Sequence, residues 1–384
     1  MSITISPKAR AVTVHICRLT MGLIFIFSGF VKAVDPWGTA LKVNEYLSIY
    51  GFEQLGWASM VFSIWLCGAE LMMGLMLTFK VRIRLISIFA FASMIFFTVL
   101  TFLNATWLPV EDCGCFGEAI KLSSWATFAK NAVLLPLSFV VWLYYRPDKI
   151  FAFSKLEVGL TVLFFTIGMG VGTYSYFHLP IIDFLPFKVG VNLREARYAD
   201  DKNAGDEDAV LVYRNVVTGD VREFNLAFED FPNEKEWEWL ETRTTNERMV
   251  VAPMLSEFVL HDSYGDATDE VLNTDGRLYM LCITDLKSLN SQNVEYMEWF
   301  VNRAGKEGAT VVCITPDDIS ATDAAYHSFG NSVPVRCYNV DATLMKTMLR
   351  AYNGVIALDD GVIVGKLNCR DIKWLMRGVK WPRE

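Results

Sequence analysis

Histidine is scarce in this sequence, which removes the basis for several kinds of active site. The 384 residues contain four histidines, which are scattered along the chain: His15, His178, His261 and His327. No potential nucleophile lies at a spacing from any of them that is typical of a catalytic nucleophile–base pair. The sequence also shows no glycine-rich phosphate loop, no zinc-hydrolase motif and no internal repeat. It therefore gives no support for a histidine-based hydrolase or a nucleotide-dependent enzyme.

The second half of the chain lacks an excess of positive charge, because its acidic residues outnumber its basic ones. Residues 178–384 carry 22 Lys and Arg against 34 Asp and Glu, whereas residues 1–177 carry 13 against 9. Phosphate contacts need clustered Lys and Arg. The acidic second half therefore argues against a nucleic-acid partner. The first half has the opposite net charge, so we expect it to be a different kind of domain.

Charges are almost absent from five long apolar runs in the first half. A bilayer span needs roughly 20 mostly apolar residues, and buried helices of soluble proteins rarely come five in a row at this length. A cleaved signal peptide does not fit the first run, which contains Arg18 and Lys32. The sequence predicts a multi-pass bundle in a lipid bilayer, with spans at Val12–Val34, Trp57–Phe79, Ile83–Leu103, Trp125–Tyr145 and Leu156–Phe177.

The distribution of Lys and Arg predicts the orientation of the bundle. Basic residues cluster before the first span, between the second and third, and between the fourth and fifth, which places these three sets on one side. The opposite loops are mainly acidic. We therefore expect a cytoplasmic N-terminus in the inner (cytoplasmic) membrane, with the 112–117 loop and the C-terminal region in the periplasm or outside the cell.

Polar side chains inside the predicted spans are candidate functional residues, because an ionisable group there is costly. Glu70 lies near the middle of the second span, and Arg18 in the first span is its candidate ion partner. The alternative is a structural pair that locks two helices. Cys67 lies one turn before Glu70, either as a packing residue or as a relay to a thiol pair. A transporter is a remote third reading, without an inverted repeat to support it.

The sequence has eight cysteines but no Cys-x-x-Cys motif, and its one closely spaced pair is Cys113-Gly114-Cys115. The pair has three readings. It could cycle between dithiol and disulfide, since a bridge over one residue is strained and easily reduced. It could be a fixed structural bridge. It could bind a metal, although two thiolates without a histidine do not complete a zinc site; no metal is expected.

The first half resembles the DoxX and MauE membrane families over residues 12–145. The resemblance is carried by Arg18–Lys32 with Pro36, by Glu70 and Gly74, by Asp112-Cys-Gly-Cys-Phe-Gly117, and by Trp125 with Lys130-Asn131. It implies a four-helix core and an association with membrane redox chemistry. For MauE this is methylamine utilisation, in the maturation of a disulfide-rich subunit; for DoxX it is quinone-linked sulfur chemistry.

The second half is predicted to be a mixed α/β region after a proline-marked connector at 178–186. Val210–Arg214 and Val221–Asn225 are expected to form a hairpin, and Phe228–Thr242 is ambiguous. Further strands are expected at Leu278–Ile283, Ala309–Thr315, Val333–Tyr338, Val355–Leu358 and Val362–Lys366. The expected helices are Val294–Ala304, Ala321–Phe329, Leu344–Tyr352 and Asp371–Gly378.

This order of strands and helices resembles the thioredoxin/peroxiredoxin fold, with Phe258–Asp262 and Gly265 resembling a peroxiredoxin-type entry. The position of the thioredoxin Cys-x-x-Cys is occupied by Thr284–Ser288, and the position of its proline by Asn353-Gly354. We expect Cys282, Cys313 and Cys337 to be inert core residues. The domain is therefore predicted to be redox-silent.

These observations predict a multi-domain chain: residues 1–155 a MauE/DoxX-like bundle, 156–190 a fifth span and connector, 191–275 a strand-rich linker, and 276–384 a thioredoxin-like domain. Cys113 and Cys115 are the candidate redox pair, and they would exchange disulfides with an extracytoplasmic protein partner. A quinone near Glu70 is the candidate electron acceptor, which would make the chain a thiol-disulfide or quinone-linked oxidoreductase. The alternative is a non-enzymatic membrane scaffold with a Cys113–Cys115 staple and a binding domain.

Overall fold

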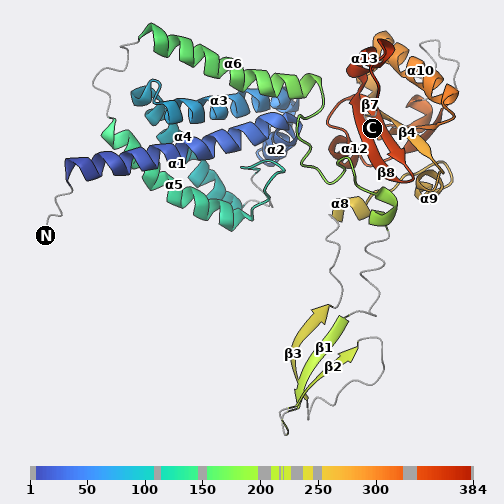
Figure 1. The fold of residues 1–384 in the computed structure, drawn as a ribbon, viewed down its shortest axis with the longest axis horizontal. Coiled ribbons are helices and arrows are strands. Elements are labelled where there is room, and N and C mark those ends of the chain that lie inside the picture. The colour runs from blue at the N-terminus through green and yellow to red at the C-terminus, as the bar shows by residue number, and fades with distance from the viewer. Residues whose placement is uncertain are drawn as a thin grey trace. The chain divides into compact units, whose positions relative to one another are not determined.

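The computed structural model describes residues 6–107, 114–145, 154–197, 209–215, 218, 220–225, 237–244, 253–322 and 335–381. The chain divides into two compact units, Met1–Leu185 and Pro186–Glu384. Figure 1 shows a first unit made of helices and a second unit that contains the sheets.

The described part of the first unit is helical. Five of its helical runs, with η1 and α3 taken together, are long and apolar enough to cross a membrane, which confirms the five predicted spans. Large side chains such as Ile16, Val61 and Val133 are 61%, 69% and 64% exposed, as expected where helices face lipid. The elements are α1 (Pro7–Val34), α2 (Pro36–Ile49), η1 (Glu53–Ala58), α3 (Ser59–Phe79), α4 (Ile83–Thr106), α5 (Ser124–Tyr144) and α6 (Lys155–Phe177).

Helix α2 was not predicted from the sequence. Asp35 ends α1 and begins α2, because its Oδ1 accepts a hydrogen bond from the backbone of Gly38 at 3.0 Å and Pro36 occupies the first helical position. The hydroxyl of Ser63 donates to the carbonyl of Pro36 at 2.8 Å, which ties the start of α2 to α3. Helix α2 thus packs against α3 beside the C-terminal end of α1.

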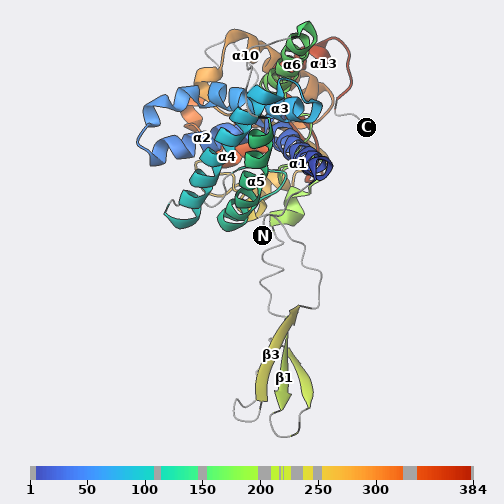
Figure 2. The ribbon, with the colours of Figure 1, turned by 90° about the vertical axis from the view of Figure 1, so that its left-hand side faces the viewer.

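The bundle is organised around a close pairing of α1 with α3. Helix α3 also packs on α6, and α4 packs on α5 (Figure 1, Figure 2). Gly22 approaches Thr78 while Gly29 approaches Leu71, so α1 and α3 run in opposite directions. This direction and register decide which side chains of the two helices meet.

Replacing Gly74 of α3 with Ala is expected to destabilise the bundle by about 1–3 kcal/mol through overpacking. A Cβ at Gly74 would lie 2.5 Å from the backbone nitrogen of Ile26, so the two helices would have to separate. Thermal unfolding of the detergent-solubilised protein measures the effect. The matched control is Gly170→Ala in α6, where a Cβ meets nothing within 4 Å; it should be neutral or slightly stabilising.

The second unit contains two sheets. The strands β1 (Ala209–Asn215), β2 (Val221–Asn225) and β3 (Trp237–Thr244) form an antiparallel sheet in the order β2-β1-β3. The predicted hairpin is confirmed, because β1 pairs with β2 in antiparallel register. The segment predicted as ambiguous contributes β3 within its described part.

The larger sheet has the order β6-β5-β4-β7-β8. Strand β4 pairs in parallel with β5, and β5 with β6, whereas β7 and β8 join in antiparallel fashion. The five predicted strands of this region are confirmed, with ends shifted by a few residues. Their bounds are β4 (Arg277–Ile283), β5 (Thr310–Thr315), β6 (Arg336–Asn339), β7 (Asn353–Asp359) and β8 (Val362–Asn368).

Short helices and one long helix accompany the larger sheet. The apolar side of α10 (Ser291–Lys306) and the buried residues of α13 (Ile372–Met376) form one core cluster with β4 and β7. Three predicted helices are confirmed with shifted ends; Ala321–Phe329 lies mostly outside the described residues. The remaining elements are α8 (Pro253–Ser256), α9 (Thr268–Leu272), η3 (Leu286–Ser288), α12 (Ala342–Met348) and η4 (Cys369–Asp371).

The chain that enters the second unit is part of its core. Phe187 is fully buried and its ring lies 6.2 Å from that of Phe258. The backbone of Gly190 and Val191 exchanges hydrogen bonds with Ile363 of β8, which covers part of that sheet edge. Arg197 binds Asp266 at 2.8 Å. Residues 186–197 therefore belong structurally with the larger sheet.

Candidate functional site

An ion pair between Lys32 and Glu70 lies inside the helical bundle. Lys32 is in the last turn of α1 and Glu70 is near the middle of α3, and they are 6% and 7% exposed. The ammonium of Lys32 donates to Oε2 of Glu70. Two opposite charges can remain in so apolar a place because each compensates the other.

The expected pairing of Arg18 with Glu70 is wrong. Arg18 lies more than three turns earlier on α1, where the antiparallel register brings it to the end of α3. Its guanidinium donates to the carbonyls of Leu77 and, at 2.7 Å, Thr78. These are carbonyls of the last helical turn, where a positive charge is favourable. Arg18 is therefore a structural residue that caps α3.

The described part of the Cys-Gly-Cys loop, from Gly114 onward, lies against the C-terminal part of α1. Gly114 and Gly117 have φ angles of +66° and +53°, and the backbone of Gly117 donates to the carbonyl of Gly114 at 3.0 Å. Cys115 lies within this turn, and its carbonyl accepts a hydrogen bond from the hydroxyl of Ser28 at 2.5 Å. The backbone of Cys115 is thereby fixed against α1. Cys113 lies outside the described residues.

Phe116 holds the same turn from its other side. Its ring lies 5.5 Å from that of Phe27 on α1. The ammonium of Lys130, on α5, lies 4.3 Å from the centroid of the Phe116 ring, a cation–π contact. The turn is thus clamped between α1 and α5.

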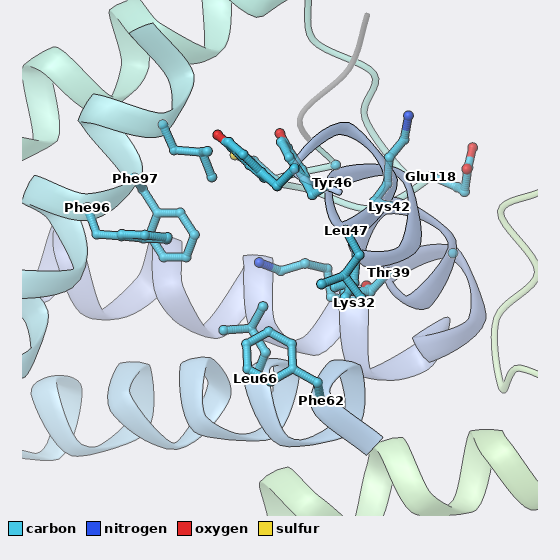
Figure 3. A pocket seen from close by; sticks show the side chains of 17 residues that line it. Lys32, Thr39, Lys42, Tyr46, Leu47, Phe62, Leu66, Phe96, Phe97 and Glu118 are labelled. Atoms are coloured by element: carbon cyan, nitrogen blue, oxygen red, sulfur yellow. The ribbon is translucent and has the colours of Figure 1, made fainter. Parts of the chain in front are cut away.

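Cys115 and Lys32 both line a cavity of about 280 Å³ between the first four helices and the loop (Figure 3). Its walls are largely apolar and aromatic, with Lys32 pointing into it and the side chains of Lys42 and Glu118 toward one end. A concave, apolar cavity with few polar groups is typical of small-ligand sites. The larger wall residues include Tyr46, Leu47, Tyr50, Phe62, Leu66, Phe96, Phe97 and Leu100.

A second cavity of about 40 Å³ also borders the ion pair. Cys115, Lys32, Glu70 and Lys130 all line it. The structure therefore brings together two of the predicted site residues, Cys115 and Glu70, together with two lysines. Arg18 lines neither cavity. Cys67 also belongs to this neighbourhood, since it interacts electrostatically with Lys32, and its thiol lies 3.6 Å from the hydroxyl of Thr39.

Lys32 and Lys130 are the functional candidates that sequence reasoning missed. Both lie within apolar runs, and an ionisable residue in such a run is itself a signal of function. Each lies close to the end of its apolar run, where a lysine is equally typical of a loop at the membrane surface. Nothing in the sequence around Ser28 indicates that its hydroxyl binds a loop nearly ninety residues later in the chain.

The cysteines of the second unit lie in a different environment. Cys282 and Cys369 are 0% and 1% exposed. Burial raises the pKa of both thiols, to about 12 for Cys369, so they are protonated and unreactive at neutral pH. Cys313 lies in the core cluster behind α10, and Cys337 packs against it.

The loop Thr284–Ser288, directly after β4, is held by hydrogen bonds to the segment before β7 and to its first residue. The backbone of Thr284 donates to the carbonyl of Tyr352 at 2.8 Å, and the amide of Asn353 donates to the hydroxyl of Ser288 at 2.8 Å. Among the described residues, no group of His, Cys, Asp and Glu could hold a metal ion. The bundle is therefore the better candidate for the functional site.

Residues 10–145 match the family model described as methylamine utilisation protein MauE. This range contains α1 except its first three residues, all of α2 to α5, the Lys32–Glu70 pair and the Cys-Gly-Cys loop. No curated protein and no solved structure matches the chain. The first unit of this membrane protein therefore carries a domain of the MauE family.

Proposed function

We propose that the chain supports thiol–disulfide exchange with a protein on the outer side of the membrane, through Cys113 and Cys115. The observation that carries the proposal is that Cys115 lines a cavity together with the buried Lys32–Glu70 pair. In the exchange, two thiols of the partner lose two electrons and two protons as their disulfide forms. The Cys113–Cys115 disulfide takes them up and becomes a dithiol.

The larger cavity fits an apolar aromatic electron acceptor. A quinone bound there would supply a carrier for the same two electrons and two protons. Aromatic side chains such as Phe62 and Phe97 would hold a flat ring, and the ammonium of Lys32 would donate a hydrogen bond to one of its oxygens. Glu70 keeps Lys32 in place from the opposite side.

The remaining features of the chain agree with an outward-facing site. The distribution of Lys and Arg supports an inner-membrane protein with a cytoplasmic N-terminus. If all five helices cross the membrane, the second unit would lie on the same side as the loop. The parallel β4–β5 pair followed by the β7–β8 hairpin supports the resemblance to a thioredoxin fold. In our proposal this redox-silent domain binds and orients the partner.

Cys115→Ser is expected to trap the partner as a mixed disulfide in cells. The exchange is reversible, so the Cys113 thiolate can attack the partner's disulfide and displace one of its two sulfurs, and no thiol remains at residue 115 to release the partner. Non-reducing gels followed by mass spectrometry of the cross-linked species make the measurement. Cys113→Ser/Cys115→Ser should trap nothing, and Cys17→Ser, at a buried position of α1, should behave like the unmodified chain. The proposal fails if Cys115→Ser traps no protein and the double variant keeps wild-type disulfide formation in outer proteins.

The second candidate function is a non-enzymatic scaffold or assembly subunit in which the two cysteines form a permanent staple. It is favoured by the fixed backbone of Cys115, which is held by Ser28 and by a glycine turn, and by the absence of cysteine from Thr284–Ser288, the segment directly after β4. Counting the free thiols of membranes with and without mild reductant separates the two. A pair that stays oxidised and resists reductant identifies the scaffold.

A further inference from the structure

The small cavity beside Cys115 has an excess of positive charge. Three ionisable residues of the described chain line it in addition to the thiol: Lys32, Glu70 and Lys130. The one carboxylate is bound to Lys32. Among the described residues no carboxylate pairs with Lys130, whose ammonium instead contacts the face of the Phe116 ring.

The other charged groups nearby are engaged elsewhere. Lys42 pairs with Glu45 at 3.0 Å, and Lys121 with Glu118 at 3.2 Å. Asp35 caps helix α2. Cys67 faces Lys32 from α3, where its thiol lies against Thr39. None of these groups lines the small cavity, so they leave its balance of two cations and one anion unchanged.

An ammonium in apolar surroundings is unfavourable unless a negative charge compensates it. A cation–π contact contributes only about 0.5–2 kcal/mol toward that compensation. Apart from Glu70, the Cys115 thiol is the group among the described lining residues of this cavity that can become negative. We infer that Lys130, together with Lys32, holds Cys115 as a thiolate, and that Lys130 is a positioning residue for this sulfur.

The inference deepens the proposed function and rests on it for its consequence. A sulfur that is stable as a thiolate is the better leaving group when a disulfide is attacked. When a partner thiolate attacks Cys113, the new sulfur–sulfur bond forms there, the Cys113–Cys115 bond breaks, and its electron pair stays on Cys115. Lys130 and Lys32 stabilise the charge that appears.

The test measures the ionisation of Cys115 by its alkylation, in the full chain in native membranes carrying Cys113→Ser. Iodoacetamide labelling of the reduced protein is followed by mass spectrometry of the loop peptide from pH 5 to pH 9. We expect Lys130→Gln to lower the labelling rate at pH 7, relative to that at pH 9, about tenfold, since an adjacent opposite charge changes ionisation by that order. Lys130→Arg should keep the wild-type ratio.

Lys121→Gln is the matched control, because it removes the same charge from an exposed residue that pairs with Glu118. It should leave the ratio unchanged. The inference is overturned if Lys130→Gln leaves the ratio unchanged, or if Cys115 of the parent chain labels at pH 7 no faster than an ordinary exposed thiol. The second criterion can be applied even if Lys130→Gln fails to fold.

Partner trapping is a separate measurement. If the labelling of Cys115 depends on Lys130 but Cys115→Ser traps no partner, the proposed function is rejected while the inference about Lys130 stands.

Discussion

Replacing Lys32 with Met is expected to destabilise the membrane bundle by about 3–5 kcal/mol, because it leaves the carboxylate of Glu70 buried without its partner. Glu70→Leu should cost a similar amount, because it leaves the ammonium of Lys32 buried without its partner. The double variant should recover most of the loss, since two apolar side chains of similar size remove both charges at once. The free energy of unfolding of the detergent-solubilised protein, followed by circular dichroism, makes the measurement.

The four proteins form a double-mutant cycle, whose interaction energy isolates the pair from the loss of packing. Lys121→Met is the control, because Lys121 is exposed, with 63% of its side chain accessible, and exposed pairs contribute little. Equal and additive losses in the two single variants would show that the buried pair contributes no coupling. In that case the ion pair with Glu70 would not explain why Lys32 is buried beside the cavity.

The sequence predicted the spans because their signal is local. A run of about 20 apolar residues needs no knowledge of its neighbours, and all five runs are helices. Helix α2 was missed although Asp35-Pro36 is a helix-start signal, because its mixed composition resembles an ordinary loop. The strands around the larger sheet were predicted for a similar reason, since each is a short apolar run between turn residues.

The partner of Glu70 could not be predicted, because it depends on how two helices are aligned. Arg18 and Lys32 both lie on α1, and the sequence offers no reason to prefer one. The close approach of Gly29 to Leu71 fixes the register and brings the last turn of α1 to Glu70. The hydrogen bond from Ser28 to Cys115 is of the same kind: it joins residues far apart in sequence, and only the folded bundle shows it.

The extent of the second unit also depends on contacts between distant segments. The sequence predicted a domain beginning at residue 276, where strands and helices start to alternate. In the structure, residues 186–197 pack on the unit through Phe187, and 253–275 through Phe258 and α9. The chain between them carries the three-stranded sheet, so the two packing segments are separated by more than fifty residues. Local patterns do not reveal such a pairing.

Phe187→Ala is therefore expected to destabilise the second unit by about 3–5 kcal/mol, the usual cost of removing a fully buried phenylalanine ring. Phe187 is 0% exposed and lies edge-on to Phe258, which is 1% exposed, so the truncation leaves a cavity that the surrounding strands cannot fill. Val189→Ala is the matched control, since it shortens a side chain of the same segment that is 55% exposed and should change stability by less than about 0.5 kcal/mol.

Urea unfolding of the second unit, released from the membrane by cleavage near residue 185, would measure both variants. If Phe187→Ala and Val189→Ala unfold at the same urea concentration, residues 186–197 are a connector and the unit begins later, near the predicted residue 276. If Phe187→Ala unfolds first, the connector is part of the domain. The second unit would then begin directly after the first unit ends at Leu185.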